Sequence, residues 1–189
     1  FKPQLVFHAA AHKHVPLMEK NIDAAILNNI YGTKVITNLA KEFNAEKFIL
    51  VSTDKVVNPT TIMGMTKHIA EKYVQLFVDC SSTKFICVRF GNVLGSNGSV
   101  VPLFSRQILE GGPITITDPN MERYFMLISE AAQLILQSTV LGNGGEVFLL
   151  EMGKPVKIID LAKKMIHLAG FTPGNEIKIK IIGARQGEK

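Results

Sequence analysis

The sequence predicts an α/β fold in which helices cover both faces of a parallel β-sheet. Strand-like segments alternate with helical segments along the first half of the chain. Two of the strands, at residues 47–52 and 84–90, are continuous apolar runs, which is typical of parallel strands buried on both faces. Each strand is separated from the next by enough residues for a helix, so right-handed crossover connections are expected.

In the first half of the chain the elements are expected in the order strand, helix, strand, helix, strand, at residues 5–8, 23–43, 47–52, 64–78 and 84–90. Three strands joined by two helical connections form part of a doubly wound sheet. We therefore expect the first half to supply the sheet.

After Gly91 the pattern changes, because glycines divide the chain into shorter elements. The expected helices and strands of this part lie at residues 100–109, 114–117, 129–140, 146–149, 158–168 and 177–181. We place the boundary between two parts of the molecule here, with residues 1–91 in one and residues 92–189 in the other. The second part is expected to be mainly a smaller α+β lobe, with some elements returning to the sheet.

The composition is that of a folded protein, with 47% hydrophobic and 20% charged residues. The net charge is +5, but the lysines are scattered and form no basic block, which argues against a nucleic-acid partner. A mild positive excess suits a ligand that carries phosphates. No apolar run approaches the roughly 20 residues that span a bilayer.

A dinucleotide-binding α/β domain needs a glycine-rich turn from its first strand into its first helix. No such motif occurs in that position here. The GNVLG segment at 91–95 follows a strand, but the next expected helix begins only near Val100. The simplest interpretation is an internal fragment that lacks the N-terminal half of its sheet.

Polar residues are concentrated at the end of the strand at 47–52, where Ser52 is followed by Thr53, Asp54 and Lys55. Open α/β sheets bind their ligands at this carboxyl end. An alternative reading is an ordinary strand end, with an aspartate that caps a helix and a solvated lysine.

The next helix begins with a methionine and a lysine four residues apart, Met63 and Lys67, which places them on one helix face. A serine or threonine at a strand end, followed by Tyr-x-x-x-Lys, is the short-chain dehydrogenase/reductase pattern, and Met63 stands at the tyrosine position. None of the three tyrosines, at positions 31, 73 and 124, has a lysine four residues later.

Three histidines, His8, His12 and His14, lie close together in the sequence, with Glu19 as the nearest carboxylate. Zinc sites normally need a better set of ligands than this. No metal is expected.

Several stretches together resemble the extended short-chain dehydrogenases of the UDP-N-acetylglucosamine 4,6-dehydratase type, which serve capsular polysaccharide biosynthesis and flagellin glycosylation. The resemblance runs in order along the whole chain to the final GARQGEK and rests on HAAAHKHVPLME (8–19), NNIYGTK (28–34), VSTDKVVNPTTIMGMTK (51–67), VRFGNVLGSNGSVVPLF (88–104), ITDPNMERYFM (116–126) and EVFLLEMGKPVKIIDLA (146–162). Met63 places the chain in a branch that has methionine where tyrosine is usual.

The resemblance implies a catalytic role for five residues. Lys67 would bind the nicotinamide ribose and Thr53 would be the hydroxyl member of the triad. Asp54 would be the acid that protonates the leaving oxygen at C6, and Lys55 the base that removes the C5 proton. Lys55 can do so only if burial or a nearby cation such as Lys67 lowers its pKa. Met63 has no proton to exchange, so Asp54, Lys55 or a water relayed through Thr53 must accept the proton from the C4 hydroxyl.

The resemblance also implies binding residues for NAD or NADP and for the sugar nucleotide. Small side chains let the backbone approach the cofactor, and arginines grip phosphates in a bidentate manner. The cofactor residues would be Ala9, Ala10, Ala11, Asn29 and Lys67, and the substrate residues Lys13, His14, Asn92, Ser99, Arg123 and Arg185.

The implied fold is an NAD(P)-binding Rossmann-like doubly wound sheet that lacks its N-terminal half, with residues 92–189 mainly forming the nucleotide-sugar lobe. The implied activity is oxidation of UDP-N-acetylglucosamine at C4, elimination of water across C5 and C6, and return of the hydride. A UDP-sugar epimerase and a non-catalytic nucleotide-sugar-binding module remain as alternatives. We expect a cytoplasmic location, a homo-oligomer in the full-length protein, and membrane contact only through segments outside this chain.

Overall fold

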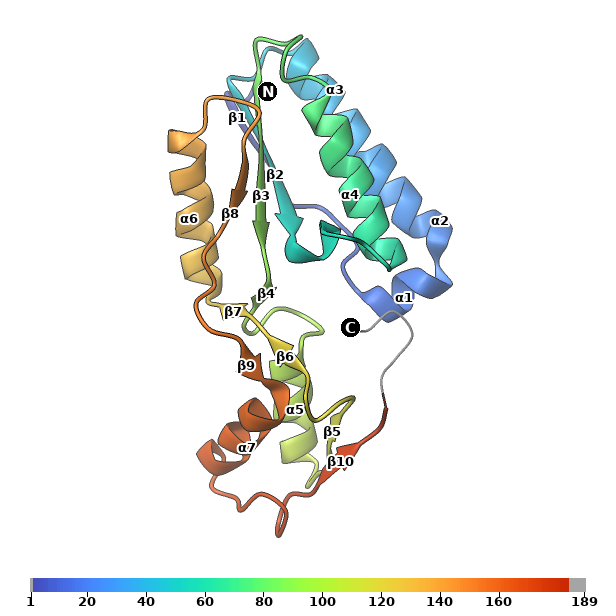
Figure 1. Cartoon of the computed structure of the whole chain (residues 1–189), viewed down its shortest axis with the longest axis vertical. Helices are drawn as coiled ribbons and strands as arrows, with labels where there is room; N and C mark the ends of the chain where they lie inside the picture. Colours follow the sequence, from blue (N-terminus) through green and yellow to red (C-terminus); the bar gives the residue numbers. More distant parts are fainter. Residues whose placement is uncertain (1, 184–189) are drawn as a thin grey trace. The chain divides into compact units, whose positions relative to one another are not determined.

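The computed structural model describes residues 2–183, which form two compact units (Figure 1). The first unit contains the chain up to Phe90 together with Ala131–Glu151. The second contains Gly91–Glu130 and the residues from Met152 onward. The chain thus leaves the first unit after Phe90 and returns to it for one helix and one strand.

The first unit is built on a four-stranded sheet with the strand order β1-β2-β3-β8. All neighbouring strands are parallel, which confirms the predicted parallel sheet. Its strands are β1 (Leu5–His8), β2 (Lys47–Thr53), β3 (Lys84–Phe90) and β8 (Val147–Leu149). The predicted strand at 47–52 is one residue longer, and this extension brings Thr53 into the sheet.

Helices cover the two faces of this sheet (Figure 1). Helices α3 (Thr33–Glu42) and α4 (Ile62–Gln75) pack on one face, and α6 (Ile128–Leu141) covers the other. The core beneath α3 and α4 contains Phe48, Leu50 and Phe85, all at most 1% exposed. The continuous apolar runs of β2 and β3 are therefore explained by burial on both faces.

The end of α6 lies directly against the sheet. A Cβ atom on Gly142 would lie 2.5 Å from the Cδ1 atom of Ile86, so a larger residue there would force the Ile86 side chain to move. Lys47 Nζ donates to the carbonyl oxygens of Thr139 and Gly142 at 2.6 and 2.9 Å. A cation at a helix C-terminus satisfies carbonyls that have no partner within the helix.

The single helix predicted at 23–43 is divided into several elements. The chain forms α2 (Ile22–Ala25), the π-helix η1 (Ile26–Gly32) and then α3, and a further helix, α1 (Val15–Lys20), precedes them. Helix α1 was not predicted, although Pro16 in its first turn is a helix-start signal. The π-helical turn was also not predicted, and its wider winding places Asn29 on the buried side.

Helix α4 begins at Ile62, two residues before the predicted start. Thr61 Oγ1 caps it by accepting the Gly64 N–H at 3.0 Å, and Glu19 Oε1 accepts the Ile62 N–H at 2.8 Å. Two of the four N–H groups that a helix start leaves without an internal partner are thus satisfied by side chains.

The second unit has its own core, formed between two helices and short strands. The helices are α5 (Val100–Leu109) and α7 (Ile158–Leu168). The strands pair as β5 (Ile114–Ile116) with β10 (Ile179–Ile181), β4 (Asn92–Val93) with β7 (Phe125–Met126), and β6 (Glu122–Arg123) with β9 (Val156–Lys157). Of these, only β5 and β10 were predicted. Within residues 2–183 no helix combines the length and the apolar character needed to cross a membrane.

Candidate active site at the end of strand β2

The turn after β2 joins three polar side chains into one chain of hydrogen bonds. Thr53 Oγ1 donates to Asp54 Oδ1 at 2.8 Å, and Lys55 Nζ donates to the same oxygen at 2.9 Å. The Lys55 N–H is 3.4 Å from Thr53 Oγ1. Thr53, rather than Asp54, is therefore the residue that caps the short 3₁₀ turn η2 (Asp54–Val56).

Asp54 and Lys55 form an ion pair in which both side chains are partly open to solvent, with exposed fractions of 42% and 35%. As a base, Lys55 was expected to need burial or a nearby cation. The structure instead pairs its ammonium with a carboxylate.

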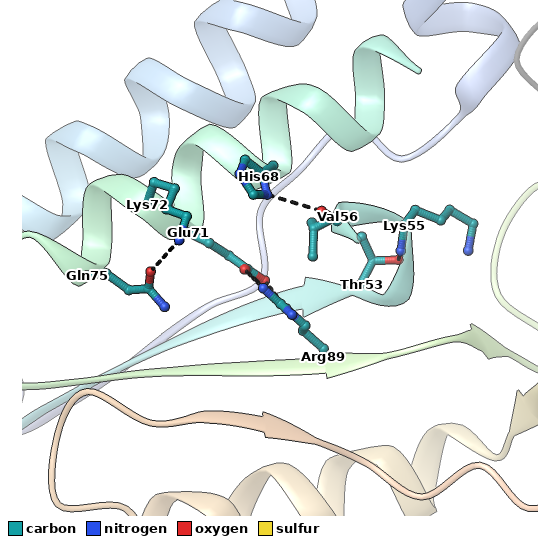
Figure 2. Close-up of polar contacts among 8 residues, drawn as sticks. All are labelled: Thr53, Lys55, Val56, His68, Glu71, Lys72, Gln75 and Arg89. Atoms are coloured by element: carbon teal, nitrogen blue, oxygen red, sulfur yellow. Dashed lines mark hydrogen bonds and ion pairs between the residues drawn. The ribbon is translucent and has the colours of Figure 1, made fainter. Parts of the chain in front are cut away.

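The turn is fastened to the start of α4. His68 Nδ1 lies 3.1 Å from the Val56 carbonyl oxygen, a contact visible in Figure 2. Because an imidazole nitrogen facing a carbonyl oxygen must donate, His68 carries its hydrogen on Nδ1 or on both nitrogens. The backbone of Lys55 also lies directly against Gly64. The position of the Asp54–Lys55 pair is therefore set by the helix that carries Lys67.

Lys67 projects from α4 to the end of β2 and is 4% exposed. Its Nζ donates to the Val51 carbonyl oxygen at 2.8 Å. Burial lowers the pKa of Lys67 to about 8, against an opposing effect of the Glu71 carboxylate. An ammonium has three hydrogens, and the bond to Val51 uses one of them.

His8 ends β1 on the same face of the sheet and is 6% exposed. Its Nε2 lies 2.9 Å from Thr33 Oγ1, which itself donates to the Asn29 carbonyl oxygen at 2.7 Å. Because the Thr33 hydrogen is already used, His8 Nε2 is the donor. Burial, with a smaller effect of Lys67, lowers the pKa of His8 to about 4, so the imidazole is neutral at pH 7.

Asn29 is completely buried and holds three segments together. Its Oδ1 accepts the His12 N–H at 2.7 Å, and its Nδ2 donates to the His12 carbonyl oxygen and to Thr66 Oγ1, both at 3.1 Å. The side chain is used within the protein. Asn29 therefore supports the segment that follows β1 rather than facing a ligand.

Met63 is 4% exposed and lies in an apolar cluster with Met18 and Ala25. Val15 and Ile62 pack against the same cluster. Met63 is thus surrounded by hydrophobic side chains from α1 and α2.

The other residues expected to bind ligands are distributed over both units. After β1, Ala9, Ala10 and Lys13 are exposed, while Ala11 and His14 are half-buried. Asn92 and Arg123 lie on short strands of the second unit, and Arg123 Nη1 donates to the Glu122 carbonyl oxygen at 2.8 Å. Ser99 stands at the N-cap position of α5, where its buried Oγ has no hydrogen-bond partner among residues 2–183. Arg185 lies outside the described residues.

Two features of the site were not predicted. One is the ion pair between Glu71 on α4 and Arg89 on β3, which lies one helical turn beyond Lys67. No sequence pattern signals this pair, because the two residues are 18 positions apart and lie on different elements. The other is the buried Ser52 hydroxyl, which has no partner in the described part of the chain. In that part no three histidine, cysteine, aspartate or glutamate side chains gather as a metal site would require.

The residues fit the ribose end of a nicotinamide dinucleotide. A buried ammonium with hydrogens to spare, the small side chains Ala9 and Ala10, and the orphan hydroxyl of Ser52 all lie at the carboxyl end of the parallel strands. Open α/β sheets bind ligands at this edge. The glycine-rich turn for the pyrophosphate has no counterpart in the sequence.

Comparison with known proteins gives a match over the whole chain. The family model described as polysaccharide biosynthesis protein matches residues 1–189. The capsular polysaccharide biosynthesis protein CapD of Staphylococcus aureus is 59% identical over 190 residues, which cover 100% of this chain and 32% of CapD. The chain therefore spans about a third of the length of this relative.

Two more distant relatives carry different activities in their names. UDP-glucose 4-epimerase of Rickettsia rickettsii is 38% identical over 97% of this chain and 53% of its own length. UDP-N-acetylglucosamine 4,6-dehydratase (inverting) of Campylobacter jejuni is 37% identical over 97% of this chain and 54% of its own length. Both activities change a sugar that is attached to UDP.

Solved structures share the fold. The structure of Pen from Bacillus thuringiensis superposes with a TM-score of 0.92 at 39% identity. The match covers 98% of this chain and 58% of the Pen chain. The structure of the dTDP-glucose 4,6-dehydratase DesIV from Streptomyces venezuelae, with NAD and TYD bound, superposes with a TM-score of 0.91 at 18% identity. The match covers 98% of this chain and 62% of the DesIV chain. At that identity the likeness shows the fold alone, and it confirms the predicted Rossmann-like class.

Proposed function

The chain belongs to the polysaccharide biosynthesis protein family, and from that premise we propose that the full-length protein containing it is a UDP-N-acetylglucosamine 4,6-dehydratase. It would oxidise the sugar at C4, eliminate water across C5 and C6, and return the hydride. The observation that carries this proposal is the acid–base pair Asp54–Lys55, held at the carboxyl end of β2. Elimination needs both an acid and a base, whereas exchange of configuration at C4 needs neither at C5 and C6.

The pair already contains the proton that elimination requires. Moving one proton along the 2.9 Å hydrogen bond from Lys55 Nζ to Asp54 Oδ1 converts an ammonium and a carboxylate into an amine and a carboxylic acid. The Lys55 amine then takes the proton from C5, and the Asp54 acid gives its proton to the leaving oxygen at C6. Water departs and the pair returns to its charged state, so no outside proton is consumed.

The cofactor would be NAD or NADP, which accepts and returns the hydride. Lys67 would hold the ribose hydroxyls with its ammonium, and the backbone at Ala9–Ala11 would allow close approach. Asn29 supports this segment through its hydrogen bonds to the His12 backbone. His8 is neutral at pH 7 and would therefore add no positive charge to this end of the sheet when the cofactor is bound.

Met63 cannot accept the proton of the C4 hydroxyl, because a thioether is not a base at neutral pH. That proton would pass to Asp54, to Lys55 or to a water held by Thr53. Thr53 Oγ1 already donates to the Asp54 carboxylate, which supports a relay between the two. For the nucleotide part of the substrate we propose contacts from Lys13, His14, Asn92, Ser99, Arg123 and Arg185.

A UDP-sugar epimerase is the second candidate, and the observation in its favour is the Rickettsia relative with that name. Both reactions begin with oxidation at C4. They differ in whether the C5 proton and the C6 oxygen leave.

The proposal is tested by incubating the full-length protein with UDP-N-acetylglucosamine and NAD or NADP. A dehydratase gives a product lighter by one water that carries a keto group. An epimerase gives an isomer of unchanged mass with altered configuration at C4, and a binding module gives no product. Measurement by mass spectrometry and proton NMR separates the three outcomes, and an unchanged mass with a new sugar isomer would reject the dehydratase.

A further inference from the structure

Two charged side chains of helix α4, Lys67 and Glu71, are buried in the first unit. Glu71 is 1% exposed, although a buried carboxylate is costly unless it is paired and hydrogen-bonded. Arg89 provides that pairing: its Nε donates to both carboxylate oxygens at 3.0 and 3.1 Å, and its Nη2 donates to Oε2 (Figure 2). This bidentate contact fixes the orientation of the Glu71 carboxylate.

Glu71 follows Lys67 by four residues on α4, so the two side chains lie on the same helix face. The close ion pair of Glu71 is with Arg89, whereas Lys67 Nζ donates to the Val51 carbonyl oxygen. The carboxylate therefore attracts the ammonium without occupying its hydrogens. A direct salt bridge would draw the ammonium away from the end of β2.

The other titratable groups that face Lys67 are neutral at pH 7. His8 on β1 is neutral because its pKa is lowered to about 4. Cys87 on β3 keeps its proton because burial raises its pKa to about 12. From β2 the contact is the Val51 carbonyl oxygen. Among these neighbours, Glu71 is the only group of the described residues that brings a negative charge to Lys67, and Arg89 acts from beyond that carboxylate.

We propose that Glu71 is a positioning residue that keeps the Lys67 ammonium charged and directed at the end of β2, and that Arg89 holds Glu71 in place for this task. The proposal rests on the cofactor-binding role given to Lys67 above. It assigns a functional reason to a buried ion pair that packing alone does not require, because a well-packed apolar pair of similar volume is often at least as stable.

The sign of the effect follows from the charges. Burial disfavours the charged form of Lys67, and the negative charge of Glu71 opposes this effect. Removing the carboxylate leaves burial unopposed, so Lys67 should lose its proton at lower pH. A neutral amine has one hydrogen fewer and no charge. As the pH is raised, NAD affinity should therefore be lost at a lower pH in the variant than in the parent.

The experiment measures the NAD dissociation constant of the full-length protein across the neutral and alkaline pH range. In Glu71→Gln the midpoint at which affinity is lost should move down by about one pH unit, so that binding becomes about tenfold weaker than in the parent at pH values above both midpoints. Glu110→Gln is the matched control, because it removes the carboxylate of the exposed Arg106–Glu110 pair, and its midpoint should equal that of the parent.

A double variant, Glu71→Leu with Arg89→Leu, separates positioning from a structural role. It leaves no unpaired buried charge, so it should fold, and its midpoint should still lie below that of the parent. A folded double variant with the parental midpoint would overturn the proposal. Failure of both variants to fold would also overturn it, since the pair would then serve the fold. If the parent itself does not bind NAD, the proposed function fails, whereas parental binding with unshifted variants rejects only this inference.

Discussion

The carbonyl oxygen of Lys55 lies 2.6 Å from the point that a Cβ atom on Gly64 would occupy. The obstacle is backbone, so it cannot move aside as a flexible side chain would. Thr61 Oγ1 and the Cβ atom of Pro59 are also close to that point, at 3.1 and 3.2 Å. The absence of a side chain at Gly64 is what allows the acid–base turn to rest against the first turn of α4.

Gly64→Ala should therefore destabilise the protein and displace the Asp54–Lys55 pair. Helix propensity alone predicts the opposite, because alanine is favoured over glycine within a helix by about 1 kcal/mol. The steric clash should outweigh this gain and lower the free energy of unfolding by about 1–3 kcal/mol. Turnover of the full-length enzyme should fall more than substrate affinity, which steady-state kinetics and urea denaturation would measure.

Gly32→Ala is the control for this prediction. Gly32 is also helical, but its Cβ atom would meet only the Leu27 carbonyl oxygen at the ordinary distance of 3.7 Å. This variant should be as stable as the parent or more stable. If Gly64→Ala behaves in the same way, the close contact with Lys55 does not constrain the site.

The acid–base pair can be tested by removing each member in turn. Asp54→Asn and Lys55→Ala should each reduce turnover of the full-length enzyme by about 100-fold or more, as is usual when general acid–base catalysis is lost. Substrate affinity should change little. Lys72→Ala, which removes an exposed lysine bonded to Gln75, is the matched control and should keep parental turnover. Near-parental turnover in both site variants would remove the pair from the mechanism.

Much of the sheet could be predicted because the apolar pattern of each strand is a local feature of the sequence. The strand at 84–90 has the predicted bounds, since its continuous apolar run reflects burial on both faces. The strand at 5–8 also has the predicted bounds, although Leu5 and Phe7 are exposed. The helices at 100–109 and 158–168 were also predicted correctly. The two-residue strands β4, β6, β7 and β9 were missed, because pairs of that length are formed by tertiary contacts rather than by a sequence pattern.

At the site, spacing predicted which residues are neighbours but not how they are bonded. The four-residue step from Met63 to Lys67 placed both on α4. It could not show that Met63 packs with Met18, because α1 was not predicted. The Gly64–Lys55 contact and the Glu71–Arg89 pair could not be predicted either, since each joins two elements that come together only in the folded chain.

Met63 should tolerate leucine but not tyrosine. Leucine has a similar volume, so Met63→Leu should cost less than about 1.5 kcal/mol of stability and leave turnover nearly unchanged. A tyrosine would restore the usual Tyr-x-x-x-Lys spacing with Lys67, yet it would have to enter a buried cluster that already contains Met18 and Ala25. We expect Met63→Tyr to lower stability by about 1–3 kcal/mol without raising turnover. A loss of turnover of about 100-fold in Met63→Leu would show instead that the sulfur contributes to catalysis.

His8 should make the folded chain less stable as the pH falls below neutral. In the folded state its pKa is lowered to about 4, whereas an unperturbed histidine titrates near 6.5. Between these values the unfolded chain binds a proton that the folded chain excludes. The free energy of unfolding should therefore decrease as the pH falls through this window, by up to about 3 kcal/mol. In His8→Gln this contribution should be absent, although the variant starts from a lower stability at neutral pH because the contact with Thr33 is altered. Urea denaturation of the two proteins from pH 7 to pH 4 would measure the difference, and curves that fall in parallel would show that His8 is not the group responsible.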